Sequence, residues 1–124
     1  MDPRLAALAR AAPGAGELTG PAVGKGGAEH PVCGDRVEVF VRCDADMVTA
    51  FAWRANGCPA TLAVAAAANA AILGSPHAQA PTRLRARLAS LGDLAVHERH
   101  AERIFLTALD RAIGEALRAD AGPA

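Results

Sequence analysis

The chain has 124 residues, enough to bury one hydrophobic core but too few for two domains of ordinary size. Its 13 basic and 13 acidic residues are interspersed and cancel at neutral pH, which excludes the basic stripe that binds nucleic acid or an anionic membrane surface. Hydrophobic residues make up 52% of the chain but aromatic residues only 3%, so we expect a core of aliphatic side chains on packed helices. A monomeric or homodimeric protein that binds a small ligand or a protein partner is predicted.

The first residues, MDPRLAALARAAPG, lack the basic start and the long apolar run of a secretory signal. No apolar stretch reaches the length that crosses a membrane, so a cytoplasmic protein is expected. Three cysteines in such a chain do not suggest a disulfide framework. Each cysteine is a candidate for metal binding, for reactivity or for simple burial.

The N-terminal part, residues 1–35, is predicted to hold one short helix and a long loop. The helix covers residues 3–12 and ends at Pro13. The Gly/Pro-rich loop that follows has at most a short edge strand near Ala22 and Val23.

Residues 36–55 are predicted to form a β-hairpin. In its first strand, Val37, Val39, Val41 and Cys43 face one way, and Glu38, Phe40 and Arg42 face the other. The turn is DAD at 44–46, and MVTAFAWR supplies the second strand.

Residues 58–119 are predicted to form helices. The first begins at Pro59, carries no charge and is expected to be buried on nearly all sides. An amphipathic helix follows at 82–91, and a last helix covers 97–119 with apolar side chains at i, i+3, i+4 spacing. A hairpin followed by helices predicts a single α+β domain.

Two cysteines are predicted to lie close together. Cys33 directly precedes the first strand of the hairpin and Cys58 directly follows the second, so both thiols come to the same end of the sheet. Cys58 also begins a helix, where backbone N–H groups favour the thiolate. Asp35 is expected to project near Cys33. Two sulfurs with an adjacent carboxylate suit zinc or iron.

Cys43 is predicted to be a core residue. Ten extended residues place it roughly 33 Å from Cys33, at about 3.3 Å per residue. It therefore cannot join the same site, and it shares a face with the strand's valines.

A further ligand is expected from the start of the last helix. His97 and His100 are three residues apart there and could bind one metal ion, or both could be solvated residues of a first turn beside Glu98 and Glu102. The spacing does not decide which of the two points at the thiols.

Four segments of the sequence resemble the NifU/IscU/SufU family of iron-sulfur cluster assembly scaffolds, in their N-terminal, cluster-building domain. HPVCGD, at 30–35, is similar to the family's Cys-Gly-Asp motif, and AWRANGCPATLAVAAA, at 52–67, to its Gly-Cys motif at a helix start. LAALARAAPGAGELTG resembles the opening helix and turn, and ERHAERIFLTALDRAI resembles the His-Cys or Lys-Cys segment of the long C-terminal helix.

The resemblance implies a three-stranded antiparallel sheet packed against four or five helices, in one domain over residues 1–124. It implies that the ligands are Cys33, Asp35, Cys58 and His100. The bound group that it implies is a [2Fe-2S] cluster, iron or zinc, and no enzymatic activity is expected. The implied partners are a cysteine desulfurase, a cluster-transfer chaperone and apo-protein acceptors.

The sequence departs from the family pattern at two positions. Ala101 stands where the family has its third cysteine, which accepts persulfide sulfur from the desulfurase and which alanine cannot replace. His30 stands where the family usually has asparagine, before Pro31, and is a candidate substitute ligand, although a loop histidine is usually just solvated.

Two classes of function remain open from the sequence. The first is a scaffold that binds a metal ion or a [2Fe-2S] cluster. The second is a non-assembling regulatory or interaction protein with the scaffold fold, which binds zinc and docks to cluster-assembly partners. A zinc hydrolase is disfavoured, because Glu98 lies outside the His-Glu-x-x-His pattern that would make it a general base.

Overall fold

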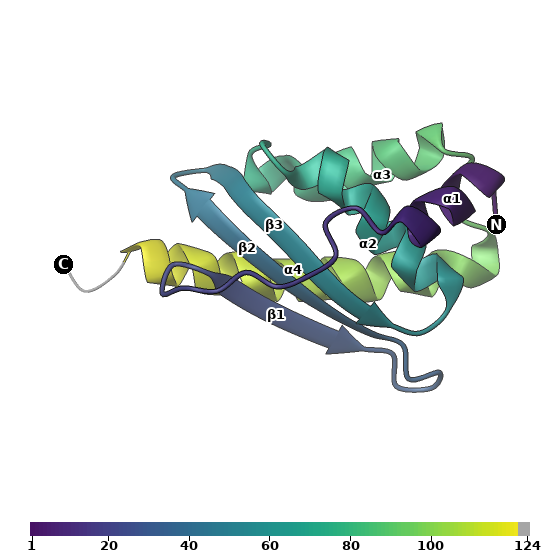
Figure 1. Cartoon of the computed structure of the whole chain (residues 1–124), viewed down its shortest axis with the longest axis horizontal. Coiled ribbons are helices and arrows are strands. Elements are labelled where there is room, and N and C mark those ends of the chain that lie inside the picture. The colour runs from purple at the N-terminus through teal and green to yellow at the C-terminus, as the bar shows by residue number, and fades with distance from the viewer. Residues whose placement is uncertain (122–124) are drawn as a thin grey trace.

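A three-stranded antiparallel sheet and four α-helices build this computed structural model, which describes residues 1–121 (Figure 1). In chain order the elements are α1 (Pro3–Ala11), β1 (Gly24–Glu29), β2 (Arg36–Asp44), β3 (Met47–Asn56), α2 (Pro59–Ile72), α3 (Ala80–Ser90) and α4 (Arg99–Ala121). Short 3₁₀ turns, His77–Gln79 and Val96–Glu98, precede α3 and α4. The predicted α+β fold with a three-stranded sheet is confirmed.

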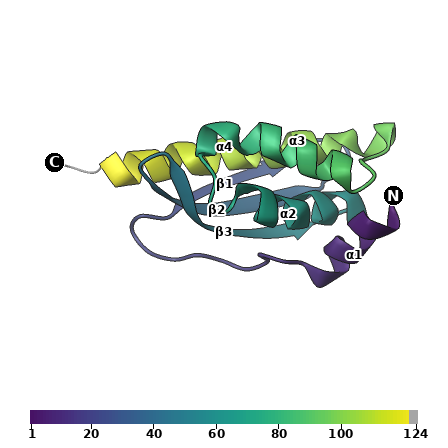
Figure 2. The ribbon, with the colours of Figure 1, turned by 90° about the horizontal axis from the view of Figure 1, so that it is seen from above.

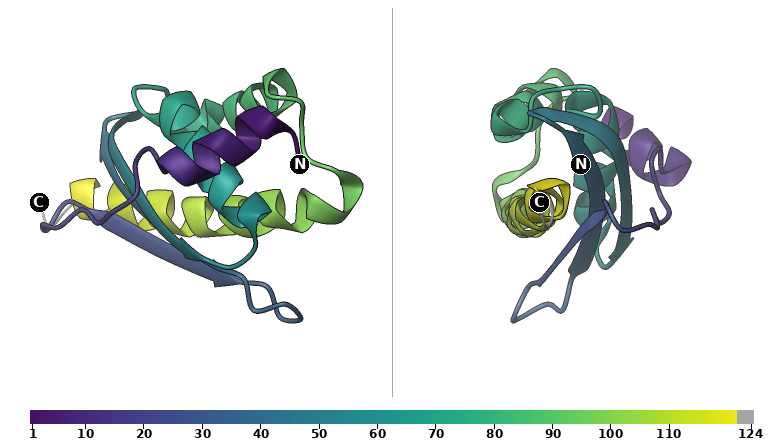
Figure 3. Two further views of the ribbon diagram at one scale, coloured as in Figure 1. Left: turned by 45° about the vertical axis from the view of Figure 1, so that its right-hand side comes forward. Right: turned by 90° about the vertical axis from the view of Figure 1, so that its left-hand side faces the viewer.

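The long helix α4 lies along one face of the sheet, against β1 and β2. The segment that joins α1 to β1 runs on the opposite side of the sheet (Figure 2). Helix α2 packs against β3 and contacts both α1 and α3, so the smaller helices gather beside the sheet (Figure 3). Within residues 1–121, none of the helices combines the length and the apolar composition that a membrane crossing requires.

The first strand is longer than the sequence indicates and lies further along the chain. A short edge strand was expected near Ala22 and Val23, within a loop, whereas β1 covers Gly24–Glu29 and pairs with β2 over its whole length. Glycine has a low β propensity, so the residues of β1 give no strand pattern.

Glycines in β1 allow α4 to approach the sheet. A Cβ atom on Gly24 would lie 2.1 Å from the carbonyl oxygen of Ala112, and one on Gly26 would lie 2.2 Å from that of Ala108. No side chain fits in that space. These strand positions therefore require glycine because the backbone of α4 lies so close to them.

The hairpin matches its prediction closely. Cys43 is 8% exposed, as expected of a core residue, and lies at an irregularity in the register between Arg42 and Cys43. Phe40 faces away from the valines as predicted but is only 5% exposed, and the Lys25 ammonium lies 5.8 Å from the centre of its ring. The outer face of the sheet is therefore partly covered.

Helix α2 is buried along most of its length, as its lack of charge predicts. Pro59 occupies its first turn, where the missing N–H costs no hydrogen bond. Cys58 is its N-cap residue, so the helix start is fixed directly beside the end of β3.

Replacing Gly26 by alanine is expected to lower the free energy of unfolding by at least about 2 kcal/mol, because the added methyl group would overlap the backbone of α4. Gly27→Ala is the matched control, since a Cβ there would contact only the Val37 carbonyl oxygen at 3.6 Å. Urea denaturation of both variants measures the difference. Equal losses would mean that these glycines matter through strand propensity and not through the approach of α4.

Candidate metal centre

The hairpin brings Cys33 and Cys58 to the same end of the sheet. Arg36, the first residue of β2, pairs with Asn56, the last residue of β3. The two flanking segments are joined directly, because the Cys58 backbone N–H donates to Asp35 Oδ1 over 3.1 Å. The two segments that carry the cysteines therefore lie at the same end of the sheet, as the hairpin topology predicts.

A tight loop carries Cys33 and Asp35. The His30 N–H donates to the Asp35 carbonyl oxygen over 2.8 Å, and the Gly34 N–H donates to the His30 carbonyl oxygen over 3.0 Å. Gly34 has a φ of +76°, a conformation that glycine adopts without strain. The loop leaves Cys33 exposed and turns Asp35 inward, where it is only 4% exposed.

Asp35 accepts hydrogen bonds from the start of α2 and lies beside the start of α4. Its Oδ1 accepts from the Cys58 N–H, its Oδ2 accepts from the Thr61 hydroxyl over 3.1 Å, and His100 Nε2 lies 3.2 Å from Oδ2. Burial alone raises the pKa of Asp35, but the hydrogen bonds from Cys58, His100 and Thr61 outweigh it and lower the pKa to about 2. Asp35 is therefore an ionised, pre-positioned oxygen donor at neutral pH.

His100 is oriented by the turn that begins α4. Its Nδ1 lies 3.0 Å from the carbonyl oxygen of His97, an acceptor that places the proton on Nδ1. Nε2, on the other side of the ring, then faces Asp35 Oδ2 at 3.2 Å and Cys58 Sγ at 3.8 Å. This is the arrangement of a histidine that ligates a metal through Nε2.

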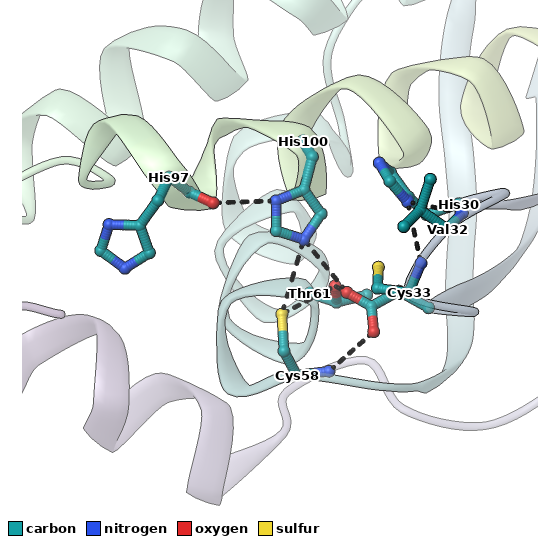
Figure 4. Close-up of polar contacts among 8 residues, drawn as sticks. His30, Val32, Cys33, Cys58, Thr61, His97 and His100 are labelled. Carbon is teal, nitrogen blue, oxygen red and sulfur yellow. Dashed lines mark hydrogen bonds and ion pairs between the residues drawn. The ribbon is translucent and has the colours of Figure 1, made fainter.

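Four donor side chains converge at this point (Figure 4). Ligand atoms of Cys33, Asp35 and His100 all lie within 4.8 Å of one another, and Cys58 Sγ adds a fourth donor 3.8 Å from His100 Nε2. Two ligands of a tetrahedral zinc ion are about 3.6 Å apart. Cys33, Asp35 and His100 are therefore close enough to hold one metal ion after side-chain movement, and Cys58 lies beside them as a candidate fourth ligand.

The other candidate histidines have different positions. His97 is exposed and supplies its carbonyl oxygen to His100, while its ring points away from the thiols (Figure 4). His30 lies beside His100, with ring centres 5.2 Å apart, but outside the group of three clustered donors.

Sequence reasoning missed Thr61. Its hydroxyl donates to Asp35 Oδ2 and lies 3.5 Å from Cys58 Sγ, so it links the carboxylate to the thiol. The available signal was a hydroxyl residue one turn into a helix that is otherwise almost entirely apolar.

A groove of about 800 Å³ adjoins the donors. It is lined by α1, by the start of α2 including Cys58 and Leu62, and by His97 and His100. Ala101, next to His100, is completely buried. The side chain of a cysteine at position 101 would therefore start in the packed interior and would not line the groove.

The comparisons with known proteins agree with this fold. The model of the NifU-like N-terminal domain family matches residues 11–119. Among functionally curated proteins, none matches this sequence significantly.

Two crystal structures illustrate the similarity. The N-terminal part of a nitrogen-fixing NifU-like protein from Brucella abortus is 19% identical, with a TM-score of 0.69 over 99% of this chain and 95% of the other. A putative iron-sulfur cluster assembly scaffold protein for the SUF system from Fervidobacterium islandicum is 14% identical, with a TM-score of 0.66 over 94% and 96%. At such identities the likeness establishes the fold.

Asp35→Asn is expected to destabilise the metal-free protein by about 2 kcal/mol at neutral pH, since the shift from 3.8 to about 2 in the pKa measures the stabilisation of the carboxylate. Because the folded pKa is the lower one, this contribution is complete above pH 3.8 and is lost as the pH falls toward about 2. Urea denaturation from neutral pH downward should show the two proteins converging. Asp110→Asn, at an exposed position of α4, is the control. A gap that stays constant with pH would contradict the role of Asp35.

Proposed function

The chain belongs to the NifU-like N-terminal domain family, and we propose that it serves as an iron-sulfur cluster assembly scaffold that holds its cargo on Cys33, Asp35, Cys58 and His100. The observation that carries the proposal is the convergence of these four side chains from three separate segments of the chain. In this proposal the protein binds and passes on its cargo and is not itself an enzyme.

The chemistry of the donors suits iron with sulfide. Two thiolates, one carboxylate and one imidazole can complete the coordination of a [2Fe-2S] cluster, because non-cysteine ligands on one iron are established chemistry. The same four donors satisfy a single iron or a tetrahedral zinc ion. Zinc is then the competing occupant of the same side chains.

Sulfur delivery uses one of the two thiols at the site. Ala101 offers no sulfur acceptor, and Cys43 is buried within the core. Cys33, which is exposed, and Cys58, which is half-buried and borders the groove, therefore remain as acceptors. The implied partners are a cysteine desulfurase as donor and a transfer chaperone or apo-proteins as recipients.

Cys58→Ser is expected to weaken metal binding by at least about tenfold, because it removes one donor of four. Cys43→Ser is the matched control and should bind metal as the natural chain does, although burying a hydroxyl there lowers the free energy of unfolding by about 1 kcal/mol. Anaerobic titration with Zn²⁺ against a competing chelator measures both. Equal loss of affinity in the two variants would contradict the assignment of the donors.

The alternative function is a regulatory or interaction protein that keeps the fold, binds zinc and docks to cluster-assembly partners without building clusters. The alanine at position 101 is the observation that favours it, because the sequence lacks the family's sulfur-accepting thiol.

Incubation with a cysteine desulfurase, cysteine and Fe²⁺ separates the two functions. A scaffold should acquire persulfide on Cys33 or Cys58, detectable by mass spectrometry and absent from the double variant Cys33→Ser, Cys58→Ser. A regulatory protein should change the rate of the desulfurase while no sulfur appears on it, and that result would overturn the proposed assembly role.

A further inference from the structure

The side chain of His30 organises the loop that carries Cys33. Its Nδ1 accepts two backbone hydrogen bonds, from the Val32 N–H and the Cys33 N–H, each over 3.2 Å. An imidazole nitrogen that accepts from N–H groups is unprotonated, so the neutral ring carries its proton on Nε2.

The backbone of His30 closes the same loop. Its N–H donates to the Asp35 carbonyl oxygen, and its own carbonyl accepts from the Gly34 N–H. Four hydrogen bonds from one residue thus tie together the segment from position 30 to position 35. In their absence Cys33 would lie on an exposed loop with little else to hold it, since its neighbour Val32 is 89% exposed.

The ring of His30 also contacts the opposite side of the site. Its centre lies 5.2 Å from that of His100, with the ring planes inclined by 72°, an edge-to-face contact. His30 is therefore packed between the Cys33 loop and the first turn of α4, and it touches two segments that carry donors (Figure 4).

From these contacts we propose that His30 is a positioning residue that holds Cys33 in register with His100, and that it is not itself a ligand. The inference rests on the proposed function, because it concerns the same metal centre. A loop restrained in this way loses less conformational freedom when Cys33 coordinates, which raises affinity without adding a donor.

Two substitutions distinguish positioning from ligation. The side-chain oxygen of asparagine lies as many bonds from the backbone as Nδ1, so His30→Asn keeps the acceptor of the loop N–H groups. The side-chain oxygen of glutamine reaches the position of Nε2. His30→Gln therefore keeps an atom that could coordinate a metal ion where Nε2 would do so. His30→Ala removes both.

The test is anaerobic titration with Co²⁺, followed by the thiolate-to-cobalt absorption bands. His30→Ala is expected to bind Co²⁺ about 10- to 100-fold more weakly than the natural chain, as loss of a supporting contact usually does. His30→Asn should recover most of the affinity and His30→Gln should not. His77→Ala, which removes an imidazole next to the turn of the hairpin, at the other end of β2 and β3, should leave binding unchanged.

Two results would overturn the proposal. Recovery by glutamine but not by asparagine would make His30 a ligand through Nε2. Unchanged binding in His30→Ala would remove any role for it.

Amide hydrogen exchange in the metal-free protein gives a second, independent readout. The amides of Val32 and Cys33 should be protected in the natural chain and in His30→Asn, and should exchange faster in His30→Ala. If the natural chain bound no Co²⁺, the proposed function would fail. The exchange rates of these two amides would still decide whether His30 restrains the loop.

Discussion

The ionised carboxylate of Asp35 joins the three segments on which the candidate centre depends. It accepts hydrogen bonds from the start of α2 through Cys58 and Thr61, and it lies 3.2 Å from His100 at the start of α4. A buried carboxylate without these partners would be protonated or expelled to solvent. The same contacts that lower its pKa therefore gather the thiol, the imidazole and the carboxylate at one end of the sheet.

The remainder of the fold holds those segments in place. Antiparallel pairing of β2 and β3 sets the Cys33 loop beside Cys58, and α4, which carries His100, packs along β1 and β2. Gly24 and Gly26 provide that close approach. The glycine strand, although distant from the donors, fixes the path of the helix that delivers one of them.

The sequence predicts those helices and strands in which apolar and polar side chains follow a recognisable pattern. The hairpin, the uncharged α2 and the long α4 have such patterns, and the adjacency of Cys33 and Cys58 follows from hairpin geometry alone. The position and length of β1 were not predicted, because its glycines have no side chains to form a pattern and the helix that packs on it, α4, lies far along the sequence. Thr61 and His30 escape it because their roles arise from contacts with loop backbone or with a distant carboxylate, which no local spacing encodes.

Ala101 makes the content of the site the central question, because candidate metal ligands lie together while the resemblance places the family's sulfur-accepting cysteine at position 101, where this chain has alanine. The most direct measurement is the iron, zinc and acid-labile sulfide content of the chain purified without oxygen. The account predicts iron and sulfide in equal molar amounts, bound to the protein. Zinc without sulfide would contradict it, and would identify a metal-binding relative of the scaffolds that builds no clusters.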